Sequence, residues 1–170
     1  TVNVSGLETD ATWEYSVDGG ASWTAGSDTA FTLSEGSYAI GAIQVRQYDV
    51  AGNVGVVQQN PAVVAIDTTN PTVTSIEISD TALSIGEMTT VTITFSEAVT
   101  GLEIADFTAD NASLSNLSTA TDYSDGTQSY TLTLTPDAPI EDTTNVVTLA
   151  SVAVSDAVGL ANTDSATSEN

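Results

Sequence analysis

The sequence lacks cysteine, histidine and lysine, and its single cation, Arg46, stands against 23 acidic residues in 170 positions. Without cysteine the chain has neither disulfide bonds nor thiol chemistry. Without histidine or lysine a serine nucleophile has no usual general base, so we expect that the protein is not an enzyme. A formal net charge of −22 opposes binding to phosphate backbones, and we therefore expect no nucleic-acid partner.

Long apolar runs are also missing. No segment approaches the roughly 18 to 20 apolar residues that span a bilayer, so we expect no membrane insertion. Residues 1–20 carry no basic region and no long apolar stretch of the kind that marks a secretory signal. Hydrophobic residues nevertheless make up 41% of the chain and charged residues only 14%, which indicates a packed core rather than a disordered polymer.

Strand patterns occur throughout the chain, and helix patterns are nearly absent. In Thr90 to Phe95 apolar residues alternate with threonines, and the same alternation returns from Tyr130 to Thr135. Such a period of two predicts half-buried antiparallel strands. Further strands are predicted at Trp13–Val17, Ser22–Ala25, Phe31–Leu33, Ala42–Tyr48, Val54–Ile66, Ile76–Ile78 and Val146–Leu149, with Val152 and Val154 continuing the last.

The turns between these strands define the fold class. Asp18-Gly19-Gly20 supplies the positive φ angles of a tight hairpin between the first two strands. Strands spaced about 8 to 12 residues apart, with turns between them, are typical of immunoglobulin-like sandwiches. The sequence therefore predicts an all-β protein made of tandem immunoglobulin-like antiparallel β-sandwiches.

A domain boundary is predicted at Asp67-Thr68-Thr69-Asn70-Pro71, because the proline cannot donate a ladder hydrogen bond and stiffens the chain. We assign residues 1–67 to a first module and residues 68–170 to a second. The first module is short and lacks an opening strand, either because it is cut there or because it is a domain split by an insertion. Asp49 to Asn53 and Asp156 to Gly159 form a weak internal repeat.

The acidic residues are placed singly at the ends of strands, and this pattern favours a hard cation. Calcium takes six to eight oxygen ligands from carboxylates, carbonyls and water. In an immunoglobulin-like order of strands, we expect Asp67, Glu97 and Asp156 to converge beside the linker, with Asn70 or a backbone carbonyl completing the shell. Asp18 and Glu35 are expected near Asp67 as further ligands. A second group is expected at the opposite end of the second module, formed by Asp80, Glu87, Asp137, Glu141 and Asp142.

Several runs resemble the bacterial Ig-like modules of giant RTX adhesins, including the marine ice-binding adhesin group. These runs are Trp13–Thr24, Ile43–Gln47, Asp49–Asn53, Asp67–Val73 and Thr92–Gly101. In the second module Leu160-Ala161-Asn162 follows Gly159, so the family's Asp-x-Ala-Gly-Asn turn is imperfect there. The resemblance implies tandem arrays that are stiffened by calcium and exported by a type I system, at the surface of a Gram-negative bacterium or secreted from it.

The expected function is therefore that of a structural extender, which presents neighbouring ligand-binding modules for cell adhesion or biofilm formation. Its expected partners are the adjacent modules of the same chain, and through them a cell-surface glycan or peptide; we expect a monomer. One alternative is a sugar- or peptide-binding module that uses Trp13, Tyr15 and Trp23, although Trp13 is better explained as a core tryptophan. A surface-layer or biofilm protein of similar fold is a third hypothesis.

Overall fold

The computed structural model describes residues 1–84, 86–137 and 146–169. The chain divides into two compact units, Thr1–Thr68 and Thr69–Asn170, so the division falls one residue after the predicted boundary. Glu141 and Asp142, two members of the predicted second acidic group, lie outside the described residues.

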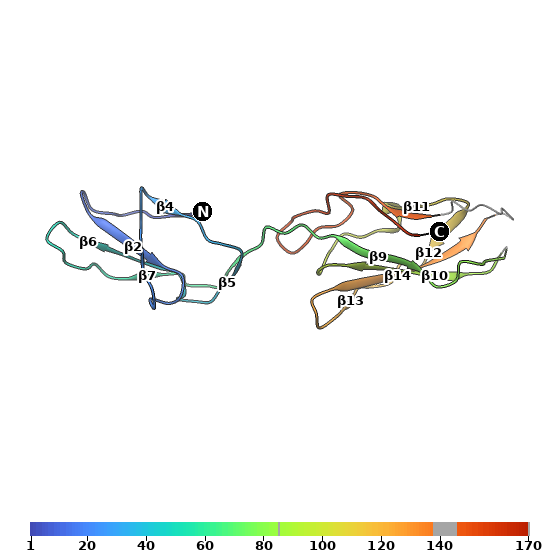
Figure 1. Ribbon diagram of the computed structural model, residues 1–170, viewed down its shortest axis with the longest axis horizontal. Helices are drawn as coiled ribbons and strands as arrows, with labels where there is room; N and C mark the ends of the chain where they lie inside the picture. The colour runs from blue at the N-terminus through green and yellow to red at the C-terminus, as the bar shows by residue number, and fades with distance from the viewer. Residues whose placement is uncertain (85, 138–145, 170) are drawn as a thin grey trace. The chain divides into compact units, whose positions relative to one another are not determined.

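The second unit is a sandwich of two antiparallel sheets (Figure 1). One sheet has the order β12-β14-β10-β9, with β13 also paired to β14, and the other has the order β11-β15-β16. A short 3-10 helix, Ile104–Asp106, precedes β11. The strands are β9 (Val73–Ile78), β10 (Thr89–Phe95), β11 (Phe107–Ala109), β12 (Ala112–Ser115), β13 (Thr121–Asp122), β14 (Gln128–Pro136), β15 (Val147–Leu149) and β16 (Ala166–Thr167).

The alternation of threonine with apolar residues builds the centre of this sandwich. Val91, Ile93 and Phe95 of β10 are each 0% exposed. Val91 lies opposite Leu132 and Ile93 opposite Tyr130 in the register of β10 with β14. Burying a side chain of this size stabilises the fold by about 1.5 to 3 kcal/mol, so this strand pair contributes strongly to the stability of the unit.

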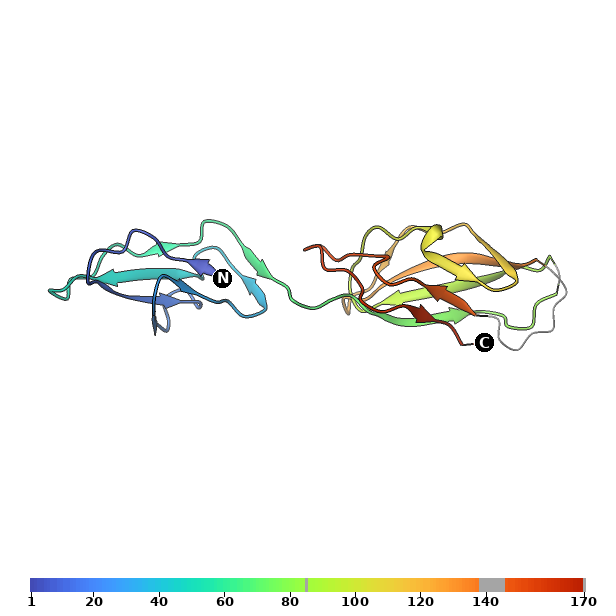
Figure 2. The same cartoon turned by 90° about the horizontal axis from the view of Figure 1, so that it is seen from above.

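The first unit is built from shorter strands around a smaller core (Figures 1 and 2). Its largest sheet has the order β3-β2-β6-β7, and two further pairs are β1-β4 and β5-β8. Trp13, Phe31, Leu33 and Ile43 are its buried apolar residues. The strands are β1 (Val2–Asn3), β2 (Thr12–Ser16), β3 (Thr24–Ala25), β4 (Ala30–Phe31), β5 (Gly36–Tyr38), β6 (Gln44–Tyr48), β7 (Gln58–Gln59) and β8 (Val64–Ile66).

The all-β fold and its antiparallel pairing confirm the prediction, but two strands differ from it. The sequence predicts a single strand over Val54–Ile66, whereas the structure has β7 and β8 separated by residues 60–63, which begin with Asn60 and Pro61. Proline has no N–H for a ladder, and the side-chain amide of Asn60 donates to the carbonyls of Ala39 and Ala62. Val152 does not continue a strand either, because its φ is +60° and it lies in a turn, 73% exposed.

Candidate metal centre

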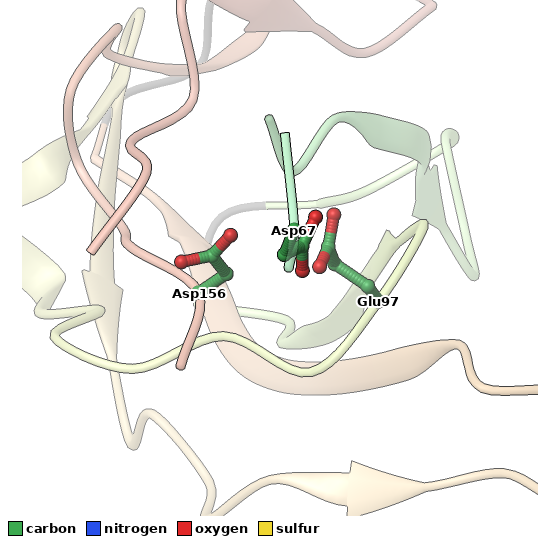
Figure 3. Close-up of side chains that lie close together, drawn as sticks. All are labelled: Asp67, Glu97 and Asp156. Atoms are coloured by element: carbon green, nitrogen blue, oxygen red, sulfur yellow. The ribbon is translucent and has the colours of Figure 1, made fainter. Parts of the chain in front are cut away.

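Three acidic residues meet where strands of the chain end. Asp67 directly follows β8 in the segment that leads into the second unit, Glu97 follows β10 after one serine, and Asp156 lies in the turn between β15 and β16. Each of them offers one carboxylate oxygen, and these oxygens all lie within 4.8 Å of one another. Figure 3 shows the three carboxylates gathered in one place. The structure thus brings together the three acids that the order of strands predicts beside the linker.

Asp156 is held in a tight hairpin that fixes the direction of its carboxylate. Its backbone N–H donates to the carbonyl of Leu160, and the N–H of Gly159 donates back to the carbonyl of Asp156. Its Oδ1 accepts hydrogen bonds from the N–H groups of Val158 at 2.9 Å and Leu160 at 2.8 Å. One oxygen is therefore fully used by the turn.

The other oxygen of Asp156 has no hydrogen-bond partner. The side chain is only 5% exposed, and Oδ2 is buried without a donor in reach. A buried carboxylate oxygen without a partner costs free energy, more than a neutral group does. Since Asp156 belongs to the group of three acids, the structure has an oxygen that a positive ion would satisfy.

The electrostatics of the group lead to the same conclusion. Two unit charges 4.8 Å apart repel by roughly 1 kcal/mol in water and by roughly 3.5 kcal/mol at an effective dielectric constant of 20. Arg46, the one Lys or Arg residue of the chain, forms an ion pair with Glu14 and is thus used elsewhere. Three carboxylates, with carbonyl and water oxygens added, match the ligands that calcium prefers.

In the corresponding hairpin of the first unit, a side chain donates to the second carboxylate oxygen of the aspartate. Asp49 makes the same backbone bonds, because its N–H donates to the carbonyl of Asn53 and its carbonyl accepts from Gly52. Its Oδ1 accepts from the Asn53 N–H at 2.8 Å, and its Oδ2 accepts from the Asn53 amide at 2.7 Å. These hydrogen bonds, the Asn53 amide bond first, lower the pKa of Asp49. Leu160 stands where Asn53 would be, so the second hairpin has no such donor.

The other predicted ligands have different local roles. The amide nitrogen of Asn70 donates to the carbonyl of Ala161 at 2.7 Å, which ties the leading segment to the returning arm of the Asp156 hairpin, where Ala161 is bridged to Ser155. Glu35 is exposed, and its Oε2 accepts a hydrogen bond from the hydroxyl of Thr68 at 2.6 Å, one residue from Asp67. Neither Asp18 nor Glu35 belongs to the group of three acids.

Asp18 organises the hairpin after β2 (Thr12–Ser16). Its carboxylate accepts the hydroxyl of Ser22 at 2.6 Å, the N–H of Ser22 at 2.9 Å and the hydroxyl of Ser16 at 2.7 Å. These hydrogen bonds, with the Ser22 hydroxyl contributing most, lower the pKa of Asp18 to about 2. The geometry explains Asp18 as the acceptor at the centre of a turn.

The aromatic residues of the first unit are engaged within the unit. Trp13 is 4% exposed, which confirms its expected place in the core, and its ring nitrogen donates to the carbonyl of Asp28. The ring of Trp23 is covered by the guanidinium of Arg46 at 3.9 Å, a cation–π contact. Arg46 also bonds to Glu14 at 2.7 Å. No specific feature of these side chains favours a sugar-stacking surface.

The fold of the second unit defines the class of protein. Its two facing antiparallel sheets form an immunoglobulin-like β-sandwich. A family described as the bacterial Ig-like domain matches residues 67–170, more than half of the chain. The protein therefore belongs to the bacterial Ig-like domain family. The matched region begins at Asp67, so all three acids of the candidate site lie within it.

Comparisons with curated proteins and with solved structures found no match. Within the described part of the chain, no helix has both the length and the apolar character needed to cross a lipid bilayer.

Proposed function

We propose that this protein is a structural extender region of a secreted bacterial adhesin of the RTX type, and that calcium stiffens it. The observation that carries the proposal is the partnerless buried oxygen of Asp156 within the group that it forms with Asp67 and Glu97. A calcium ion there would take one or more oxygens from each carboxylate and remove their mutual repulsion. Membership of the bacterial Ig-like family, whose domains are often extracellular, supports a location outside the cell.

Calcium would act by restraining the segment that joins the two units. Asp67 is the last residue before the threonine pair and Asn70-Pro71 of the linker, whereas Glu97 and Asp156 are rooted in the second sandwich. A cation shared by the three holds Asp67 to that sandwich. Binding that occurs only in this arrangement stabilises it by mass action. Extracellular calcium modules typically bind at roughly 10⁻⁴ to 10⁻³ M, so the site is expected to fill at millimolar calcium.

In this proposal the protein is a spacer on the surface of a Gram-negative bacterium. Neighbouring modules of the same chain would contact a glycan or a peptide on another surface, in adhesion or biofilm formation. A net charge of −22 is partly neutralised by bound divalent ions in this setting. The fold and the site supply stiffness and spacing, and no chemical step is assigned to them.

Calorimetric titration of calcium together with small-angle scattering tests the proposal. The wild-type chain is expected to bind calcium and to show a narrower distribution of dimensions in calcium than in EGTA. Glu97→Gln should weaken binding at least tenfold and remove the difference in scattering. Asp110→Asn, which neutralises an exposed acid after β11, is the charge-matched control and should behave as wild type. Calcium binding of the same strength in Glu97→Gln, or identical scattering profiles in calcium and EGTA, would refute the proposal.

A further inference from the structure

The three acids of the candidate site are carried by three separate segments of the chain. Asp67 lies in the segment that enters the second unit, Glu97 in the turn after β10, and Asp156 in the hairpin after β15 (Figure 3). Residues close to each acid hydrogen-bond to another of these segments. Such bonds determine how closely the three carboxylates are held together by the protein itself.

The entering segment is bonded to the turn that carries Glu97. The N–H of Thr72 donates to the hydroxyl oxygen of Ser96 at 3.0 Å, and the N–H of Ser96 donates to the carbonyl of Thr72 at 2.9 Å. Ser96 directly precedes Glu97 in the chain. Two hydrogen bonds therefore fix the start of the Glu97 turn against the entering segment.

The Glu97 turn is also bonded to the Asp156 hairpin. The N–H of Thr100 donates to the carbonyl of Ser155 at 2.8 Å, and the N–H of Ser155 donates to the carbonyl of Thr100 at 3.0 Å. The hydroxyl of Thr100 adds a weaker bond to the same Ser155 carbonyl at 3.3 Å. Because Ser155 directly precedes Asp156, these bonds hold the second pair of acid-bearing segments together.

Asn70 closes this set of contacts into a ring. Its amide nitrogen donates to the carbonyl of Ala161 at 2.7 Å, and Ala161 is bridged to Ser155 within the Asp156 hairpin. The entering segment, the Glu97 turn and the Asp156 hairpin are thus joined pairwise. None of these bonds uses a carboxylate of the three acids, and all of the residues that make them belong to the second unit.

Among the bonds of this ring, that of Asn70 provides the anchor nearest to Asp67. Asn70 is three residues from Asp67, and Thr72 is five residues from it. An extended chain spans at most about 3.3 to 3.6 Å per residue, so the reach from Asn70 is about 10 Å and that from Thr72 about 17 Å. A longer tether lowers the effective concentration of the Asp67 carboxylate at the site.

We propose that Asn70 is a positioning residue of the metal centre, which holds the entering segment against the Asp156 hairpin before the ion binds. The inference rests on the calcium site proposed above, and it gives Asn70 a role other than that of a ligand. Less conformational entropy is lost on binding when the ligands are already in place. Asn70 therefore raises the affinity for calcium without contacting the ion.

The first test of this role needs no metal and uses the full chain. Asn70→Ala removes the bond to Ala161. The matched control is Thr74→Ala, which removes another bond from a side chain to a backbone carbonyl, that of the Thr74 hydroxyl to Thr94 at 3.0 Å, outside the ring. In EGTA, the backbone order parameter of residue 70 from 15N relaxation should be about 0.85 in wild type and in the control. In Asn70→Ala it should fall towards about 0.6.

The second test measures calcium directly. Calorimetric titration should give a Kd about threefold higher, or more, for Asn70→Ala than for wild type, whereas Thr74→Ala should keep the wild-type Kd. The 13C chemical shift of the Asn70 side-chain carbonyl should change little when calcium is added, because its amide group bonds to Ala161 with and without the ion. A ligand would instead show a shift that follows the filling of the site.

The possible failures can be told apart. Equal Kd values for wild type and Asn70→Ala would overturn the role of Asn70 and leave the calcium site in place. A carbonyl shift that follows the filling of the site would make Asn70 a ligand and would also overturn it, as would an order parameter at Asn70 that rises only with calcium. A wild-type chain that binds no calcium would refute the proposed function, and the role of Asn70 would fall with it.

Discussion

Asp156 provides the sharpest prediction, because its replacement by asparagine should have opposite effects with and without calcium. Asp156→Asn keeps the carbonyl oxygen that accepts from Val158 and Leu160, so the hairpin can form. It removes one charge from the group and places an N–H₂ donor where Oδ2 has no partner. Without calcium the variant should be more stable than wild type, and with calcium it should lose its advantage.

The magnitude follows from the geometry. Three charges with oxygens within 4.8 Å of one another form three repulsive pairs, and the substitution removes two of them. Each pair costs roughly 1 to 3.5 kcal/mol, and the lower end applies because Asp67 and Glu97 are partly exposed. We therefore expect the calcium-free variant to gain about 2 kcal/mol, or roughly 10 °C in melting temperature for a domain of this size. In wild type, calcium at 100 times its Kd should add about 2.7 kcal/mol.

Differential scanning calorimetry in EGTA and in calcium measures both effects. The second unit contains no tryptophan, so the calorimetric transition that is silent in tryptophan fluorescence belongs to it. Asp110→Asn is again the charge-matched control and should follow wild type in both conditions. The reasoning would be refuted if Asp156→Asn melted below wild type in EGTA, or if it kept the full rise in calcium.

The remaining predictions concern the two cores, the hydrogen bonds of the Asn162 side chain and one turn. Ile93→Ala should destabilise the second unit by about 2 to 5 kcal/mol in urea titrations monitored by circular dichroism, since the side chain is 0% exposed; a loss below 1 kcal/mol would contradict that packing. Asn162→Ala should cost about 3 kcal/mol in the same assay, because three backbone groups lose their partners, and a neutral outcome would show that water replaces the amide. Gly26→Ala should lower the fluorescence midpoint of the first unit, because the added Cβ would lie 2.1 Å from the ring of Trp13; an unchanged midpoint would mean that the ring moves without cost. The pKa of Asp18 is lowered from 3.8 to about 2, so its contribution is complete above about pH 4 and is lost as the pH falls through 2; Asp18→Asn should flatten the fall of the fluorescence midpoint over this range, and an equally steep fall in the variant would contradict this.

Strand identity could be predicted where threonine alternates with large apolar residues. In β10 the pattern fixes which face is buried, and its register with β14 follows, because a slip by one residue would expose Ile93 and its neighbours. The pattern does not predict the strands between Val54 and Ile66. Valines recur there, but Val56 is 84% exposed and so does not belong to a core. There the side chain of Asn60 and the missing N–H of Pro61 decide the backbone path, and neither shows in a hydrophobic period.

The candidate site was accessible to sequence reasoning in part. Strand order alone places Asp67, Glu97 and Asp156 together, because turns at one end of a sandwich gather the residues that they carry. The decisive detail was not accessible, since the use of one Asp156 oxygen by the hairpin and the isolation of the other depend on atomic geometry. The difference between Asn53 and Leu160 is visible in the sequence. Only the hydrogen bonds of the two hairpins show its consequence, which is that Asn53 supplies a side-chain donor to Asp49 and Leu160 supplies none to Asp156.

A crystal structure of the wild-type chain grown in calcium, with anomalous data, tests the central claim most directly. The account predicts one anomalous peak among Asp67, Glu97 and Asp156, with Oδ2 of Asp156 at about 2.3 to 2.6 Å from the ion. A map in which these three carboxylates surround only water, at a calcium concentration of several millimolar, would contradict it.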